Sequence, residues 1–355
     1  MRALRSWFSA LYFLSVAPYC AAQSAAPHAE LPKDPKAVLA MAAKRYDFND
    51  PSLKPWHLKA TYQLYDENGN PTEQGTFEYW WASPLVYRST WTRGASSYTE
   101  WHTADGKFAY LSTGSGLAFF ESRLKAELLS PLGDAKDYDP ASSYLDKEEV
   151  KFGKVKVPCI MVVPKMPNHG QLLNVPLGLF PTYCFDPEVP VLFGETSFGA
   201  LQVLFGNQVL VQDRYLAKSV NEVENGKKVL TASVETIEGM SPTDSALVPP
   251  PDAKKPPVEA VQVDQKIMNA QRIGGPMPVY PQDAKNARAE GTVTLKALIG
   301  QDGRIHDLKV VTAPFPSLVQ SAMWAVSHWE YKPYLLNGDP VAVETTIKVT
   351  FRLGG

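Results

Sequence analysis

The chain has 355 residues, a formal net charge of −2 at pH 7 and 45% hydrophobic residues. This length is enough for two ordinary domains. The nearly balanced charge, without any run of lysine or arginine, argues against a nucleic-acid partner.

Residues 1–22 have the form of a secretory signal peptide. Arg2 and Arg5 give a positive start, Trp7–Ala17 is apolar, and small residues lead to an expected cleavage after Ala22. The alternative is an uncleaved anchor in the inner membrane. A membrane span requires roughly 20 apolar residues, whereas this run is shorter and is interrupted by Pro18. We therefore expect a secreted chain in the periplasm.

Residues 34–240 are predicted to form a β-rich periplasmic domain. Asp34 and Pro35 favour a helix over Lys36–Arg45, and a second helix is expected over Ala118–Leu129. Strands are expected where apolar and polar residues alternate between turn residues. They cover Leu58–Leu64, Thr76–Trp81, Leu85–Trp91, Ser97–Thr103, Lys107–Leu111, Val155–Val163, Val189–Phe193, Ala200–Leu204, Arg214–Val223 and Lys228–Ile237.

Two cysteines, Cys159 and Cys184, remain in the expected mature chain. An oxidising compartment favours a disulfide bond between them. Two buried free thiols are the alternative.

The first domain resembles the LolA/LolB-like periplasmic lipoprotein-carrier fold. The resemblance rests on the leading helix, the antiparallel strand rhythm and the sequences Gly75-Thr76-Phe77 and Ser83–Arg88. It implies an open-barrel-like sheet with a lid helix around an apolar cavity. The aromatic residues that would face such a cavity are Phe77, Tyr79, Trp80, Trp81, Trp91, Trp101, Phe119 and Phe120. The alternative is that they fill the core of the sheet, as aromatic side chains usually do.

Residues 241–262 are expected to be a Pro-rich linker. Pro249–Pro251 and Pro256–Pro257 make this segment stiff and extended. At about 3.1 Å per residue, ~20 residues reach at most ~60 Å. We expect a spacer between two domains.

Residues 263–355 show the pattern of an antiparallel sheet with helices. Thr292–Ala297 alternates between polar and apolar residues, and Asp302-Gly303 then indicates a hairpin turn. Residues 317–328 have an apolar face at helical spacing. Asn337-Gly338 indicates a second hairpin, and Val343–Leu353 alternates again.

This part of the chain, from about residue 270 to 355, resembles the TonB C-terminal domain family. Eight residues carry the order and spacing of that family: Tyr280, Pro281, Gly291, Asp302, Gly303, Trp329, Tyr331 and Pro333. The resemblance implies an antiparallel sheet with two helices, which binds a partner peptide as an added strand beside the last strand. The binding edge would be Thr345, Thr346, Ile347, Lys348, Val349, Thr350 and Phe351.

The expected fold class is therefore α+β, and the sequence leaves two functions open. In the first, the chain is a TonB-like cell-envelope protein that binds an outer-membrane TonB-dependent receptor or another envelope protein. Such a protein would support energy-dependent transmembrane transport, and direct coupling to an inner-membrane motor would require the uncleaved anchor. In the second, the N-terminal domain carries or senses a lipid or other apolar ligand, and the C-terminal domain serves docking or dimerisation. Homodimers are part of either hypothesis, because free strand edges self-associate.

No catalytic chemistry is predicted. The six histidines lack the spacings of common zinc sites, and no nucleophile motif with an evident triad is present. We expect a protein without enzymatic activity, metal or cofactor.

Overall fold

The structure is a computed structural model of the whole chain. It describes residues 31–353 except 67, 115–116, 118, 134–142, 153–154, 166–174, 176, 188, 198–200, 255–259 and 337. The expected signal peptide, residues 1–22, lies outside the described residues.

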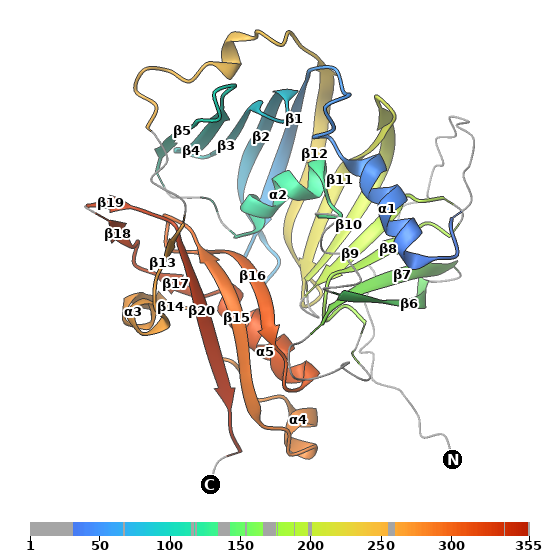
Figure 1. Cartoon of the computed structure of the whole chain (residues 1–355), viewed down its shortest axis with the longest axis vertical. Coiled ribbons are helices and arrows are strands. Elements are labelled where there is room, and N and C mark those ends of the chain that lie inside the picture. The colour runs from blue at the N-terminus through green and yellow to red at the C-terminus, as the bar shows by residue number, and fades with distance from the viewer. Residues whose placement is uncertain are drawn as a thin grey trace.

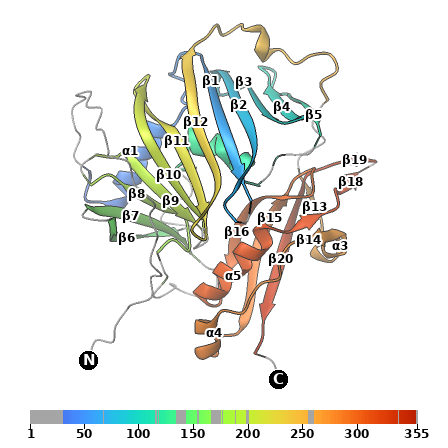
Figure 2. The same cartoon turned by 180° about the vertical axis from the view of Figure 1, so that it is seen from behind.

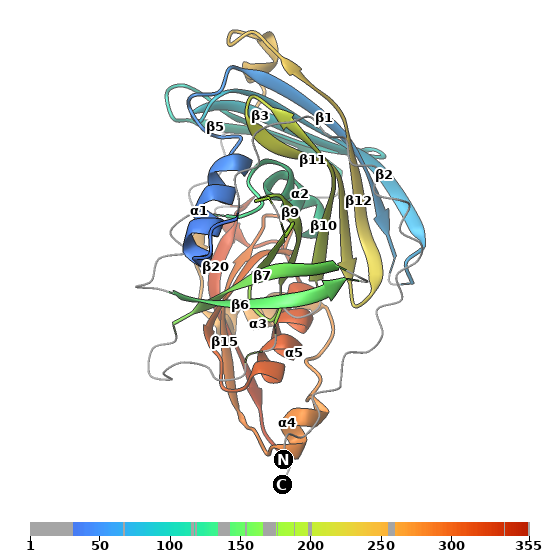
Figure 3. The same cartoon turned by 90° about the vertical axis from the view of Figure 1, so that its right-hand side faces the viewer.

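The first part of the chain folds into one open antiparallel sheet of twelve strands, which curves around two helices (Figures 1 and 3). The strand order is β5-β4-β3-β2-β1-β12-β11-β10-β9-β8-β7-β6, so the first and last strands pair in the middle and β5 and β6 form the edges. The helices are α1 (Pro35–Tyr46) and α2 (Phe119–Leu129). The strands are β1 (Trp56–Tyr65), β2 (Pro71–Ser83), β3 (Val86–Arg93), β4 (Ser96–His102), β5 (Phe108–Thr113), β6 (Ser143–Phe152), β7 (Val155–Pro164), β8 (Thr182–Phe185), β9 (Leu192–Ser197), β10 (Leu201–Val211), β11 (Arg214–Glu224) and β12 (Lys227–Gly239).

Local sequence explains how the concave side of this sheet is filled. Every second residue of β1, from Trp56 to Leu64, is buried, as its alternating sequence predicts. Asp34 caps α1 by accepting a hydrogen bond from the backbone N–H of Ala37 at 3.1 Å. The buried faces of α1 and α2 pack with the sheet residues in one apolar core. Each fully buried large apolar side chain contributes about 1.5–3 kcal/mol to folding.

Two strands of this sheet, β6 and β8, were not predicted from the sequence. The edge strand β6 carries Asp146, Lys147, Glu148, Glu149 and Lys151, so it lacks the expected apolar alternation, yet it pairs with β7 along its whole length. Strand β8 has only four residues, all buried between β7 and β9. Both strands form because they pair with neighbouring strands, although their own sequences lack a strand pattern.

The last part of the chain forms a second sheet in the order β13-β20-β15-β16. Strand β15 is antiparallel to both β20 and β16, and the turn between β15 and β16 contains the predicted Asp302-Gly303. The strands are β13 (Val261–Gln262), β15 (Gly291–Ile299), β16 (Ile305–Thr312) and β20 (Val343–Phe351). Two small pairs accompany them: β14 (Arg272–Gly274) with β17 (Glu330–Tyr331), and β18 (Leu335–Leu336) with β19 (Asp339–Pro340).

The α+β fold class and the open N-terminal sheet are confirmed, but the second region has one more helix than predicted. Helices α4 (Gln282–Asn286) and α5 (Pro316–Ser327) correspond to the two expected helices. A third helix, α3 (Gln265–Gln271), precedes them. It has seven residues and only one of them, Met268, is buried, so its sequence carries no clear helical period.

The connection between the two sheets packs against the outer face of the first sheet. A single 3₁₀ turn, η2 (Ser245–Leu247), places the Ala246 carbonyl 3.0 Å from Nε1 of Trp101, and Leu247 is buried. Lys254 forms an antiparallel bridge with Tyr110 on the edge strand β5. The described part of the linker is therefore attached to the first sheet.

The second sheet lies beside the first (Figure 2), and the two sheets share an apolar core. Met161 and Val163 of β7, with Leu179 and Phe180 of the following segment, belong to the cluster that contains the buried face of α5. Nearby, Nε2 of His328 lies 3.1 Å from Oε2 of Glu224. The C-terminal region is therefore packed against the N-terminal region.

Among the residues that the structure describes, none of the helices combines the length and the apolar sequence needed for a membrane span.

Candidate functional site

Strand β20 has a complete neighbour on one side and a very short one on the other. Its pairing with β15 runs from Val343, opposite Ile299, to Phe351, opposite Gly291. On the outer side, β13 pairs in parallel only with Val343 and Glu344. Within the described part of the chain, no strand pairs with this outer side beyond Glu344. The predicted edge thus has no strand partner along most of its length in the described part of the chain, but it is covered at its start.

The hydrogen bonds of β13 show which backbone groups of β20 point outward. Val261 donates its N–H to the Ala342 carbonyl at 2.9 Å, and Val263 donates to the Glu344 carbonyl at 3.0 Å. In an antiparallel pair, residues alternate between facing the partner strand and facing away from it. Beyond Glu344, the N–H and C=O groups of Thr346, Lys348 and Thr350 therefore point away from β15.

The side chains of β20 follow the same alternation. Thr345, Ile347, Val349 and Phe351 are buried, and the ring of Phe351 meets Tyr280 edge-on at 5.5 Å. Thr346, Lys348 and Thr350 are exposed on the other face. Of the seven predicted edge residues, three point their backbone groups away from β15, and the Lys348 carbonyl among them accepts the side-chain amide of Gln265 at 3.3 Å. The other four bond to β15 and fill the core.

Charges on the exposed face surround this edge. Glu344 accepts hydrogen bonds from Lys296 Nζ, at 2.8 Å, and from the amide of Gln262, and these bonds lower the pKa of its carboxyl group. Lys348 and Arg352 are exposed further along the strand. The free part of the edge is therefore bordered by basic side chains.

The predicted motif residues hold the parts of this region together. Tyr280 donates its hydroxyl to the Ala289 carbonyl at 2.6 Å, and Trp329 donates Nε1–H to the Pro276 carbonyl at 2.8 Å. Gly303, between β15 and β16, has φ +77° and accepts the N–H of Tyr331 at 2.8 Å. An added Cβ at Gly303 would lie 2.0 Å from the Tyr331 carbonyl oxygen, so the turn requires glycine.

The remaining motif residues have local backbone roles. Pro281 precedes α4 as its N-cap residue, Gly291 begins β15, and Asp302 lies in the hairpin turn. Pro333 follows the short strand β17. These positions support the sheet and lie outside its free edge.

The aromatic residues of the N-terminal domain are mostly core residues. Phe77, Tyr79, Trp81 and Trp91 are buried in the cluster shared with α1 and α2, and Phe120 packs against it. Trp101 is buried beneath the linker. Trp80 stacks on His57 at 4.5 Å on the outer face, because both alternate with core residues. The side chain of Phe119 lies outside the described residues.

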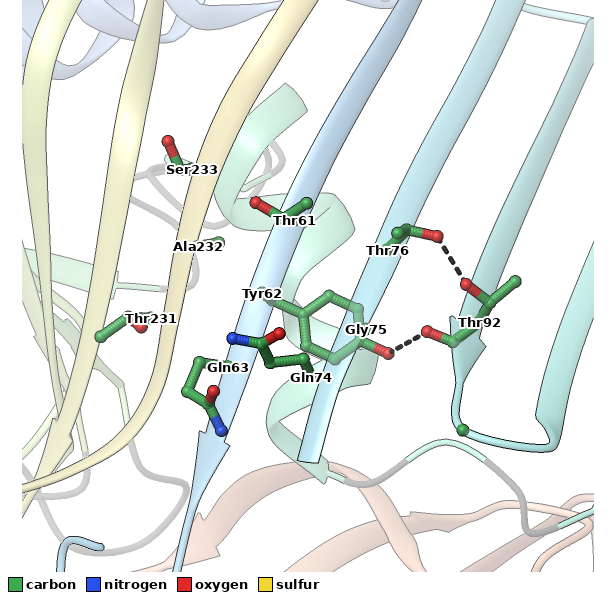
Figure 4. A pocket seen from close by; sticks show the side chains of 11 residues that line it. Thr61, Tyr62, Gln63, Gln74, Gly75, Thr76, Thr92, Thr231, Ala232 and Ser233 are labelled. Atoms are coloured by element: carbon green, nitrogen blue, oxygen red, sulfur yellow. Dashed lines mark hydrogen bonds between the residues drawn. The ribbon is translucent and has the colours of Figure 1, made fainter. Parts of the chain in front are cut away.

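The N-terminal sheet carries a groove that bears on the carrier hypothesis. Its volume is about 500 Å³, and it lies over β1, β2, β3 and β12 (Figure 4). Seven of the lining residues have polar side chains, namely Thr61, Gln63, Gln74, Thr76, Thr92, Thr231 and Ser233, and the lining also includes Tyr62 and Ala232. The apolar-ligand hypothesis stays a prediction.

Cys159 and Cys184 are joined by a disulfide bond between the neighbouring strands β7 and β8. Both residues are buried. The bond lies in the N-terminal sheet, away from the edge of β20.

A buried charge cluster beneath α2 was missed by the sequence analysis. Nε of Arg123 lies 3.2 Å from Glu127, and Nη2 lies 3.8 Å from Glu195. Glu222 completes the cluster and is fully buried. Burial raises the pKa of Glu195 to about 7 and raises the pKa of Glu222 well above its usual range. One feature of the sequence could have indicated this cluster: Glu222 lies on the same buried face of β11 as Leu216 and Val220.

Comparison with known proteins separates the two regions of the chain. Residues 276–353 match the family model of the Gram-negative bacterial TonB protein C-terminal region. The protein TonB of Vibrio cholerae serotype O1 is 34% identical over 79 residues, which cover 22% of this chain and 32% of that protein. The match thus spans about a third of that relative's length.

Solved structures with a similar fold include an outer-membrane lipoprotein-sorting protein domain from Vibrio parahaemolyticus. It is 9% identical and covers 58% of this chain and 93% of its own, with a TM-score of 0.36. A LolA superfamily protein from Nitrosomonas europaea is 6% identical, and the match covers 59% of this chain and 96% of that protein, with a TM-score of 0.37. These likenesses concern the fold alone. The C-terminal resemblance is confirmed by sequence: residues 276–353 match the TonB C-terminal family.

Proposed function

We propose that this chain is a TonB-like cell-envelope protein whose C-terminal domain binds an extended peptide by adding it as a strand to the outer edge of β20. The partner we propose is an outer-membrane TonB-dependent receptor. The single observation that carries the proposal is the outward orientation of the backbone groups of Thr346, Lys348 and Thr350. Enzymatic activity is not part of this proposal.

Strand addition suits this edge for physical reasons. Each new backbone hydrogen bond contributes about 1 kcal/mol net to binding. Backbone bonds also place few requirements on the side chains of the partner peptide. The exposed Lys348 and Arg352 favour a peptide with acidic side chains. Self-association through the same edge is the competing use of these groups.

The proposed location is the periplasm, on the evidence of the signal-like sequence of residues 1–22 and of the TonB similarity. Support of energy-dependent transport belongs to the same proposal. The mass of the mature N-terminus tests it. A chain that begins at Gln23 would exclude direct coupling to an inner-membrane motor and leave a binding role. An intact Met1 in the inner membrane would favour energy transduction.

The binding site is tested with two substitutions at one position. Lys348→Pro removes the outward N–H, and an edge strand tolerates proline where the N–H has no ladder partner. Lys348→Ala keeps the N–H and is the matched control. We expect Lys348→Pro to weaken binding of a fluorescent receptor-derived peptide by about tenfold or more, since it removes one hydrogen bond and obstructs its neighbours. Equal affinities of both variants for the peptide would contradict strand addition at this edge.

A further inference from the structure

The outer edge of β20 is already occupied at its start by a segment of the same chain. We call Val261–Gln271 the capping segment; it comprises β13, the connection Val263-Asp264 and helix α3. Strand β13 runs parallel to β20, and α3 follows it on the same side of the sheet (Figure 1).

The capping segment makes the kind of bonds that an added strand would make. The backbone N–H groups of Val261 and Val263 bond to the carbonyls of Ala342 and Glu344. Thr345 then donates its hydroxyl to the Val263 carbonyl at 2.7 Å. This side-chain bond occurs where the backbone ladder stops.

Helix α3 extends the cover further along the edge. Gln265 donates its side-chain amide to the Lys348 carbonyl at 3.3 Å. This carbonyl belongs to the group of outward acceptors that a partner strand would use. Met268 is buried in the core of the C-terminal region and anchors the helix there.

From these contacts we infer that the capping segment competes with the partner peptide for the edge of β20. The inference rests on the proposed function and adds its regulation. While the segment is in place, the outward carbonyls of Ala342, Glu344 and Lys348 are occupied. Within the described part of the chain, the outward groups of Thr346 and Thr350 and the N–H of Lys348 stay open to a partner. A partner that uses the whole strand must displace the segment.

The competition has a quantitative basis. A tethered segment acts at an effective concentration on the order of millimolar, so a free peptide at lower concentration competes at a disadvantage. The cover itself consists of a few bonds, each of small net strength, so it can be displaced by a partner with a longer ladder. Loosening the capping segment should therefore strengthen peptide binding.

The test uses Val263→Pro in the full chain, with Val263→Ala as its matched control. Both variants remove the branched valine side chain, but only proline removes the N–H that bonds to the Glu344 carbonyl. The probe is a fluorescein-labelled octapeptide of alternating valine and threonine with an N-terminal glutamate. We expect Val263→Pro to bind the probe about five- to tenfold more tightly than wild type, and Val263→Ala to stay within about twofold, since one net hydrogen bond corresponds to that ratio.

Two further readouts make the result decisive. Amide exchange at Val261, without the probe, reports whether Val263→Pro has released the segment. Gln265→Ala removes only the bond to Lys348 and should tighten binding about twofold. If Val261 is released and affinity does not rise, while wild type still binds, the competition is excluded and the proposed function stands. If neither wild type nor any variant binds the probe, the proposed function fails and this inference fails with it.

Discussion

The two sheets of this protein differ in how accessible their edge strands are to a further strand. The twelve-stranded sheet ends on one side in β6, whose charged side chains oppose pairing with another chain, and on the other in β5, which pairs with the linker at Lys254. In the four-stranded sheet, the backbone groups of Thr346, Lys348 and Thr350 of β20 have no strand partner on the outer side in the described part of the chain, and only the Lys348 carbonyl is bonded there, to Gln265. The comparison indicates that the first sheet is protected against strand addition, whereas the second is suited to it.

The largest expected effect concerns the core that the two regions share. Phe180 lies in the N-terminal region but packs in the C-terminal cluster, where it is 3% exposed. Phe180→Ala should lower the free energy of unfolding by about 3–5 kcal/mol, the usual range for a buried phenylalanine. Chemical unfolding, followed at probes in each sheet, measures this loss.

If the regions share one core, both sheets should unfold at a lower denaturant concentration in this variant. The control Phe108→Ala removes an aromatic side chain that is 48% exposed, and it should cost less than about 1 kcal/mol. A shift confined to one sheet would show that the two regions are energetically independent.

A middle-sized effect concerns pH and is confined to the first region. Glu195 and Glu222 have pKa values raised by burial, so the folded state binds more protons than the unfolded state. The free energy of unfolding should therefore be highest in mild acid and fall by on the order of 2 kcal/mol as the pH rises through the Glu195 pKa of about 7.

Glu222→Gln should flatten this fall and raise stability at pH 8, because glutamine resembles the protonated side chain and cannot ionise at high pH. Thermal unfolding between pH 5 and 9 measures both effects. The control Glu238→Gln, with a side chain that is 69% exposed, should leave the profile unchanged. A profile that rises between pH 5 and 8 would contradict the assignment of these carboxyl groups.

The smallest effect concerns the attachment of the linker to the first sheet. Trp101→Phe removes the hydrogen bond to the Ala246 carbonyl and should cost about 1 kcal/mol. Limited proteolysis should then cut the segment 241–254 faster than in wild type, while Trp80→Phe, which keeps the bond, should not change the rate. Equal cleavage of all three proteins would show that the linker is held by other contacts.

The sequence predicted those features whose signals are local. The alternation of Val343–Leu353, the turn at Asp302-Gly303 and the apolar face of residues 317–328 all correspond to observed elements. Each depends on residues that are near neighbours in the chain, so periodicity and turn chemistry are sufficient. The match to the TonB C-terminal family has the same local origin.

The features that the sequence missed depend on distant residues. Strand β13 has two residues and exists only because Ala342 and Glu344 provide its hydrogen-bond partners. The packing of Phe180 against the α5 cluster joins positions more than a hundred residues apart. The capping segment on the edge of β20 could therefore not be predicted from the sequence, although the edge itself was predicted.

The most direct test of strand addition at β20 is amide hydrogen exchange, residue by residue, with and without a saturating receptor-derived peptide. Strand addition should give an alternating response along β20. The N–H groups of Thr346, Lys348 and Thr350 should exchange at least about tenfold more slowly with the peptide, because they gain a ladder partner. Those of Ile347 and Val349, already bonded to β15, should change little. Protection without this alternation, or protection confined to other strands, would contradict the proposed edge.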